Sequence, residues 1–142
     1  MSNSLNFLGM ARKAGKLEIG EEFTGVAVRL KKARVIILAS DASENARRRA
    51  ENFSKAGNVP LIELKYTKAE LGRALDKASP AMAAITDIGF AAAFVERIAD
   101  EGSDCGELAE ELAAKAAKAK RRRRETLAGK RNARVGKRRK KV

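Results

Sequence analysis

Short apolar segments alternate with amphipathic segments along the first 98 residues of the chain. Residues 34–39 predict the clearest strand, because an uninterrupted apolar run follows the arginine, as in a strand buried on both faces. Residues 60–64 and 81–85 predict two further short strands. Residues 16–19 alternate between polar and apolar side chains and form either a fourth short strand or a connector.

Helical periodicity separates these strands. Helices are predicted over residues 4–13, 20–32, 42–56, 68–75 and 88–98. In the second helix the apolar positions fit two faces, either Phe23, Ala27 and Leu30 or Thr24, Ala27 and Val28. The order of strands and helices implies βαβ units, and therefore an α/β fold with a central sheet and helices on both of its faces.

Capping signals mark the ends of several of these helices. Asp41 and Glu44 have the spacing of a capping box, and so have Thr67 and Glu70. Gly57 suits the position just after the third helix, where the left-handed conformation favours glycine. The candidates for the cap of the last helix are Thr86 and Asp87.

Charge divides the chain into three blocks. The 142 residues carry a net charge of +13. Residues 1–99 contribute +5, residues 100–111 contribute −6 from six acids and no base, and residues 112–142 contribute +14. This distribution predicts a compact domain at residues 1–99, an acidic hinge at residues 100–106 and a basic tail at residues 107–142.

The tail is predicted to be helical over residues 107–120, which are rich in good helix formers, and disordered from residue 129 onward when free. Its first dense run of cations includes Arg121, Arg122, Arg123 and Arg124. Such a run neutralises several phosphates at once, and the released counterions give affinity for nucleic acid without reading its sequence. A solubility tail, a nuclear-localisation signal and a patch for acidic membranes are the alternatives.

The composition argues against an enzyme, a metal site and a membrane protein. The chain has no histidine and a single cysteine, Cys105, so it lacks the commonest general base and the usual zinc ligands. No nucleophile or phosphate-loop motif accompanies its paired carboxylates. No apolar run approaches the roughly 20 residues of a membrane helix, and the first nine residues lack the features of a signal peptide. We therefore expect a cytoplasmic, non-catalytic protein without cofactor or metal.

The helix that begins at Gly20 is a candidate phosphate site, because a helix N-terminus presents free backbone N–H groups and the positive end of the helix dipole. The same features suit the carboxylates of Glu21 and Glu22, and the residues alone favour this purely structural role. The cations that could surround the start of the helix are Arg12, Lys13 and Lys16. Three arginines at residues 47–49 point in different directions on a helix, which favours a solvated helix face.

Five motifs occur in a familiar order: LGMARKAGK at residues 8–16, GEE at 20–22, ARVIILASD at 33–41, ELG at 70–72 and AITD at 84–87. The set resembles the ribosomal protein L7Ae and L30e superfamily, in particular its small bacterial stand-alone members. The resemblance covers about residues 4–98. It implies a three-layer α/β/α sandwich with a small mixed sheet. It also implies binding of structured RNA, typically a kink-turn.

The resemblance also implies two RNA-contacting segments. The first falls on Gly20, Glu21, Glu22, Phe23 and Val26, and the second on Ala78, Ser79 and Pro80. Family members carry asparagine, glutamate and lysine where this chain has Glu22, Phe23 and Val26. Glu22 can still accept hydrogen bonds from base amino groups. Because it also repels phosphate, the site needs compensating charge from Lys13, Lys16 or the tail.

The predicted function is that of a non-catalytic RNA-binding protein associated with ribosomal or other structured RNA. The domain would recognise the shape of the RNA, and the tail would add electrostatic affinity. The chain is expected to be monomeric when free. The alternatives are a ribosome-associated assembly module that also contacts protein, and a non-specific DNA-compacting protein.

Overall fold

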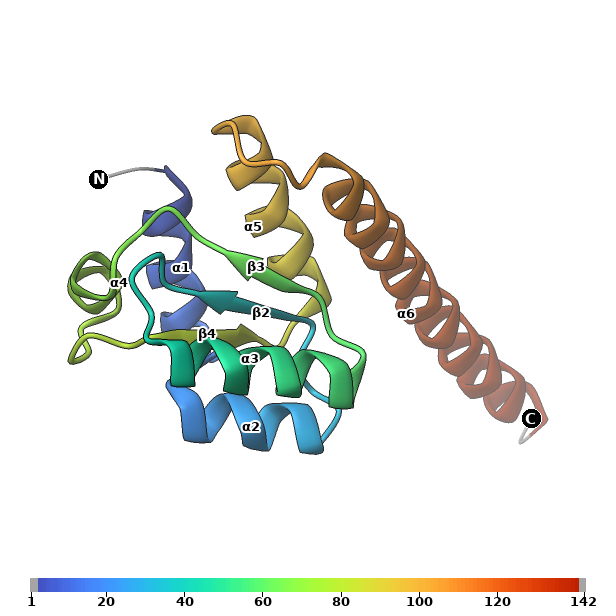
Figure 1. Cartoon of the computed structure of the whole chain (residues 1–142). Coiled ribbons are helices and arrows are strands. Elements are labelled where there is room, and N and C mark those ends of the chain that lie inside the picture. The colour runs from blue at the N-terminus through green and yellow to red at the C-terminus, as the bar shows by residue number, and fades with distance from the viewer. Residues whose placement is uncertain (1–2, 141–142) are drawn as a thin grey trace.

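The computed structural model of the chain describes the backbone of residues 3–140 and the side chains of residues 4–130. Within this range four strands form one sheet, and six helices surround it or extend from it (Figure 1). The strands are β1 (Leu17–Ile19), β2 (Val35–Leu38), β3 (Leu61–Glu63) and β4 (Met82–Ile85). The helices are α1 (Asn3–Lys13), α2 (Glu21–Arg29), α3 (Glu44–Gly57), α4 (Lys68–Leu75), α5 (Ile88–Asp100) and α6 (Gly106–Lys140).

The sheet is mixed, with the strand order β1-β4-β2-β3. Strands β2 and β3 are parallel, whereas β4 runs antiparallel to both β1 and β2. The register gives the sheet two distinct ends. Ile85 pairs with Leu17 and Val35 at one end, which we call the Ile85 end. Met82 pairs with Leu38 at the other, which we call the Met82 end.

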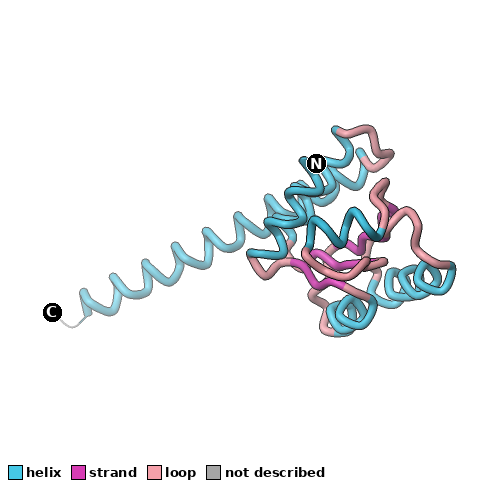
Figure 2. The backbone as a smooth tube through the Cα atoms, turned by 90° about the vertical axis from the view of Figure 1, so that its left-hand side faces the viewer, coloured by secondary structure: helices cyan, strands magenta, loops and turns pink. Residues whose placement is uncertain are grey.

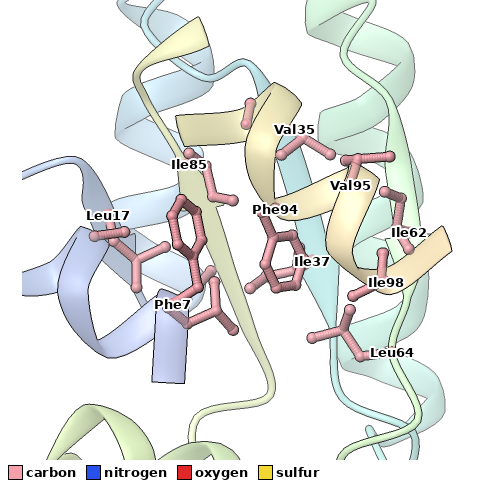
Figure 3. Packing of buried hydrophobic residues seen from close by; sticks show 14 of the residues in the cluster. Phe7, Leu17, Val35, Ile37, Ile62, Leu64, Ile85, Phe94, Val95 and Ile98 are labelled. Atoms are coloured by element: carbon pink, nitrogen blue, oxygen red, sulfur yellow. The ribbon is translucent and has the colours of Figure 1, made fainter. Parts of the chain in front are cut away.

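Strand β2 buries side chains on both faces, as its continuous apolar sequence predicted. On one face Val35 and Ile37 join Phe94 of α5 in a cluster that also includes side chains of α1 and α4 (Figure 3). On the other face Ile36 and Leu38 pack with side chains of α2 and α3. Helices therefore cover both sides of the sheet, which confirms the three-layer α/β/α sandwich.

Helix α2 uses one of the two faces that its sequence left open. Thr24, Ala27 and Val28 are buried, whereas Phe23 and Leu30 are each 58% exposed. The buried face meets α3 and the sheet. A large aromatic side chain therefore stays on the surface in the first turn of α2.

The cap of α3 differs from the prediction. Ser43 caps this helix by accepting the N–H of Ala46 at 3.2 Å, so the predicted capping box of Asp41 and Glu44 is wrong. Asp41 instead accepts the N–H of Lys68, the first residue of α4, at 2.8 Å. Its carboxylate thus ties the end of β2 to the start of α4.

The other caps follow the prediction more closely. The capping box of Thr67 and Glu70 is present, and Asp87, one of two candidates, caps α5. The predicted left-handed residue after α3 was wrong. Gly57 is the last helical residue, and Asn58, with φ 52°, takes the left-handed position. Asparagine tolerates this conformation better than most residues.

Helix α6 turns back along α5 and then leaves the domain (Figures 1 and 2). Leu112 is only 1% exposed and joins the same core cluster as Phe94, so the first part of α6 is anchored. The helix continues to Lys140, which corrects the expected end near residue 120 and the disorder expected from residue 129. The extension contains no proline, and more than half of residues 121–140 are Lys or Arg, which have high helix propensity.

Hydrogen bonds hold Glu101, the residue that follows α5 in the acidic segment 100–106. Ser4 of α1 is fully buried and donates to the Glu101 carboxylate from its backbone N–H at 3.1 Å and its hydroxyl at 2.6 Å. The hydroxyl of Tyr66 donates to the same carboxylate at 3.2 Å. Burial acts to raise the pKa of Glu101, but these hydrogen bonds outweigh it, so the pKa is lowered. The contact ties the end of α5 to α1.

Candidate nucleic-acid interface

The N-terminus of α2 is the one predicted site that stands out in the structure. Gly20 precedes the helix with φ 100° and ψ 162°, a conformation essentially restricted to glycine. No side chain caps this helix, whereas side chains cap α3, α4 and α5. The N–H groups of the first turn therefore remain available to an acceptor from outside the protein.

The second predicted segment lies beside this helix start. The N–H of Gly20 donates to the carbonyl of Met82 at 2.9 Å, which joins the start of α2 to the first residue of β4. The loop of residues 76–81 leads directly into β4. The structure therefore brings both segments implied by the resemblance together at the Met82 end.

The 76–81 loop has an unusual backbone. Asp76 and Ser79 have positive φ angles of 53° and 36°. Ala78 and Ser79 are exposed, but Pro80 is buried, so it shapes the loop and offers little surface to a ligand. A shallow depression lies along the loop and α4, lined by Ala69, Gly72, Arg73, Asp76, Lys77, Ala78 and Ser79.

Side chains of α2 complete a surface, which we call the Met82-end surface and define as residues 20–23, 26, 78 and 79. Glu22 and Phe23 are exposed, and Val26 is half-buried. Glu21 forms an ion pair with Arg49 of α3, with 2.7 Å between its carboxylate and the guanidinium. This ion pair offsets one of the two negative charges at the site.

The three consecutive arginines of α3 diverge, as their spacing predicted. Arg47 binds Glu63 of β3 at 2.8 Å, Arg49 binds Glu21 of α2, and Arg48 is exposed. Arg49 is therefore a neighbour of the candidate site that the sequence analysis missed. No signal in the sequence marks it, because the pairing depends on how α2 packs against α3.

The cations expected around Gly20 lie elsewhere. Lys16 precedes β1 and Gly20 follows it, so the strand separates them by about 13 Å at roughly 3.3 Å per residue. Lys16 lies at the Ile85 end, where its carbonyl accepts the N–H of Thr86 at 2.9 Å. Arg12 and Lys13 end α1 just before this point. The structure therefore corrects the idea that these cations compensate Glu22.

The cationic tail is also remote from Glu22. Helix α6 begins near β3 and the residues after α5, and beyond residue 119 every described side chain is exposed. Its four arginines are Arg121, Arg122, Arg123 and Arg124. Successive residues of a helix are about 100° apart, so they point around the whole circumference. They form a cationic rod that projects from the domain (Figure 2), on the side away from α4 (Figure 1).

The described part of the chain contains no constellation that suits catalysis or metal binding. Its side chains form no group of His, Cys, Asp or Glu that could hold a metal ion. Burial raises the pKa of the Cys105 thiol, and Asp104 adds to the effect, so the thiol stays protonated and weakly nucleophilic. Among residues 3–140, no helix is both long and apolar enough to cross a membrane.

Comparison with known sequences gives concordant matches. The profile of the family described as "Ribosomal protein L7Ae/L30e/S12e/Gadd45 family" matches residues 3–95. A relative from Enterococcus faecium, described as "RNA-binding protein YlxQ", is 38% identical over 88 residues, which cover 62% of this chain and 84% of the relative. A second protein of the same description, from Bacillus subtilis strain 168, is 32% identical over 84 residues, which cover 59% and 83%.

Solved structures show the same fold. A protein of unknown function from Bacillus halodurans has a TM-score of 0.63 and 26% identity, covering 69% of this chain and 98% of the other. The Giardia lamblia 15.5kD RNA binding protein has a TM-score of 0.52 and 19% identity, covering 80% and 83%. At that identity, the second likeness establishes the fold alone.

Proposed function

The chain belongs to the ribosomal protein L7Ae/L30e/S12e/Gadd45 family, and we propose that it binds structured RNA through the Met82-end surface. The family assignment agrees with the non-catalytic class predicted from the sequence. Both YlxQ relatives are described as RNA-binding proteins, and the match spans more than four fifths of each of them. In this proposal the protein acts in the cytoplasm on ribosomal or other folded RNA.

The observation that carries this proposal is the uncapped start of α2 beside the 76–81 loop. Gly20 has no side chain, so an RNA backbone can approach the helix closely. The free N–H groups of the first turn suit a phosphate or a base carbonyl. The hydrogen bond from Gly20 to Met82 holds the helix start and the loop in one arrangement, so little ordering is needed on binding.

Phe23 would change how the protein recognises a base, compared with the glutamate of the family pattern. The family pattern has a glutamate at this position, and this chain offers an aromatic ring that is 58% exposed. An exposed ring can stack on an unpaired base, which is a common mode of RNA recognition. Glu22 beside it can accept hydrogen bonds from amino groups of guanine or cytosine. We therefore propose recognition of a kink-turn or a similar internal loop in which stacking replaces part of the usual hydrogen bonding.

The projecting half of α6 would add affinity without specificity. Its cations, with no aromatic residue among them, can neutralise phosphates but cannot stack on bases. Binding through this helix would weaken steeply as salt concentration rises. The tail would thus raise the rate and strength of association, and the domain would select the RNA.

Fluorescence anisotropy with two RNAs tests the proposal. One RNA is a kink-turn, and the other has its sheared G·A pairs replaced by Watson–Crick pairs. The full-length protein is expected to prefer the kink-turn by about tenfold or more, which corresponds to about 1.4 kcal/mol. If it binds both RNAs equally and both complexes dissociate with rising salt, the domain is a backbone binder and the proposal is wrong.

Phe23→Ala locates the binding surface. Loss of one stacked base should weaken kink-turn binding by about fivefold or more, because such stacking contributes about 1–3 kcal/mol. Leu30→Ala is the matched control, since Leu30 follows the same helix and is also 58% exposed but lies at its opposite end. Equal effects of the two substitutions would exclude Phe23 as a specific contact.

A further inference from the structure

A second basic surface lies at the Ile85 end, away from the Met82-end surface. The backbone places two of its members, because the carbonyl of Lys16 accepts the N–H of Thr86 and the N–H of Arg34 donates to the carbonyl of Ile85. Lys16 and Arg34 therefore flank the end of β4 from its two sides. We call this set the Ile85-end surface, and it consists of Arg12, Lys13, Lys16, Arg29, Lys31, Lys32 and Arg34.

The sequence spreads these cations over 23 positions, and the fold gathers them. Arg12 and Lys13 end α1, and Arg29 ends α2. The turn that follows α2 carries Lys31 and Lys32 and leads into β2, whose first residue pairs with Ile85. Arg12 and Lys16 are half-buried, and the other five are exposed. The result is a solvent-facing cluster with one sign of charge.

These seven cations are unpaired, unlike two arginines of α3. In the part of the chain whose side chains are described, none of the seven forms an ion pair, whereas Arg47 and Arg49 each bind a carboxylate. Asp87 follows Thr86 at this end, and its carboxylate is engaged in capping α5 through the N–H of Phe90 at 2.9 Å. Unpaired like charges held together repel one another, and an anionic ligand relieves that repulsion.

The projecting part of α6 leaves the domain on this side. Helix α5 begins after Asp87 at the Ile85 end and finishes near Glu101, which contacts Ser4 and Tyr66. Helix α6 runs back along it, and the 15 residues from Gly106 to Lys120 span about 21 Å, which exceeds the length of α5 by only about 3 Å. Figure 1 shows α6 diverging on the side of the loop between α2 and β2, away from α4.

We propose that the Ile85-end surface is a second RNA-backbone site, so that one protein molecule holds two RNA segments at once. The inference rests on the proposed function, which supplies the first segment at the Met82-end surface. The surface offers lysine and arginine cations without an exposed aromatic ring among its members, which suits phosphates and not unpaired bases. A duplex region of RNA therefore fits it better than a single-stranded loop.

The test uses full-length protein with Lys32→Ala and Arg34→Ala, two exposed members with ordinary backbone angles. The control carries Arg48→Ala and Lys65→Ala, which remove the same charge from exposed positions outside both surfaces. Binding of a short RNA duplex is measured over a range of salt. The test variant should lose about fivefold in affinity, with a log–log salt slope smaller by about two, and the control should change by less than about twofold.

A capture experiment then asks whether the two sites act together. Kink-turn RNA is immobilised, protein is added, and retention of a labelled RNA duplex is measured. Wild-type protein and the control should retain the duplex, and the test variant should bind the kink-turn with unchanged preference but hold the duplex with about fivefold lower affinity. Equal losses in test and control variants would overturn the proposal, and so would a parallel loss of kink-turn preference in the test variant.

Two further outcomes separate this inference from the proposed function. The wild-type protein could show no kink-turn preference while its duplex binding depends on Lys32 and Arg34. This outcome would support the Ile85-end surface as an RNA site and refute kink-turn recognition at the Met82-end surface. If a DNA duplex of equal length binds more tightly than the RNA duplex at matched salt, the surface is not an RNA site and the inference is overturned.

Discussion

The substitution Gly72→Ala tests how the 76–81 loop is held against α4. Gly72 is a buried residue of α4. A Cβ atom added there would lie 2.6 Å from the carbonyl oxygen of Lys77 and 3.0 Å from the backbone nitrogen of Ser79. Both neighbours are backbone atoms, so no side-chain rotation can relieve the contact. The loop itself must move.

Two opposing effects determine how much Gly72→Ala changes the free energy of unfolding. Alanine is favoured over glycine inside a helix by about 1 kcal/mol, which would stabilise the variant. Reaching an ordinary contact of 3.4 Å requires the loop to retreat by about 0.8 Å, and such overpacking costs about 1–3 kcal/mol. The loop already holds two residues at positive φ, so the upper part of that range applies. We expect a net loss of about 1–2 kcal/mol in the free energy of unfolding.

Urea denaturation followed by circular dichroism measures this loss. Gly129→Ala is the matched control, because a Cβ there meets no atom within 4 Å and the site is exposed on α6. The control should be as stable as the wild type or slightly more stable. A Gly72→Ala variant at least as stable as the wild type would refute the argument, since only the helix-propensity gain would then remain. Displacement of Ser79 should also reduce kink-turn preference.

Two further predictions concern single groups. Gly20→Ala should lower the free energy of unfolding by about 1–3 kcal/mol in urea titrations, because φ 100° and ψ 162° strain any residue with a Cβ. A loss below about 0.3 kcal/mol would contradict this account. Glu101→Gln tests the contact with Ser4. Because the pKa of Glu101 is lowered in the folded protein, its carboxylate stabilises the fold at pH values above 4.5, its ordinary pKa. This stabilisation is lost as the pH falls through the folded-state pKa. The stability gap between wild type and variant should therefore be present at neutral pH and shrink in acid, and a gap independent of pH would contradict the assignment.

Local signals predicted local features well. The capping box of Thr67 and Glu70 follows from residues three positions apart, and the structure contains it. The same spacing at Asp41 and Glu44 predicted a capping box that the structure lacks. The Asp41 carboxylate instead accepts the N–H of Lys68, 27 positions along the chain. Both pairs look alike in the sequence, and a distant N–H group decided between them.

The orientation of α2 shows the same limit. Its sequence allowed two apolar faces, and the fold buried the one with Thr24 and Val28. Close packing against α3 accounts for the choice, because a Cβ on Gly25 would lie 2.9 Å from the ring of Phe53. The small residue admits α3 on that side, and Phe23 is consequently left in solvent, where the proposed function uses it.

The sequence by itself determined the α/β class, the strands β2 and β4, the family resemblance and the amount of charge in each segment, because these depend on composition and on short-range patterns. Only the tertiary structure decided where that charge lies. Lys16 and Gly20 are four positions apart, yet β1 carries them to opposite ends of the sheet. Lys16 and Arg34 are 18 positions apart, yet pairing with β4 brings them to the same end. An extended strand separates near neighbours in sequence, and strand pairing joins distant ones, so the two proposed surfaces become visible only in the fold.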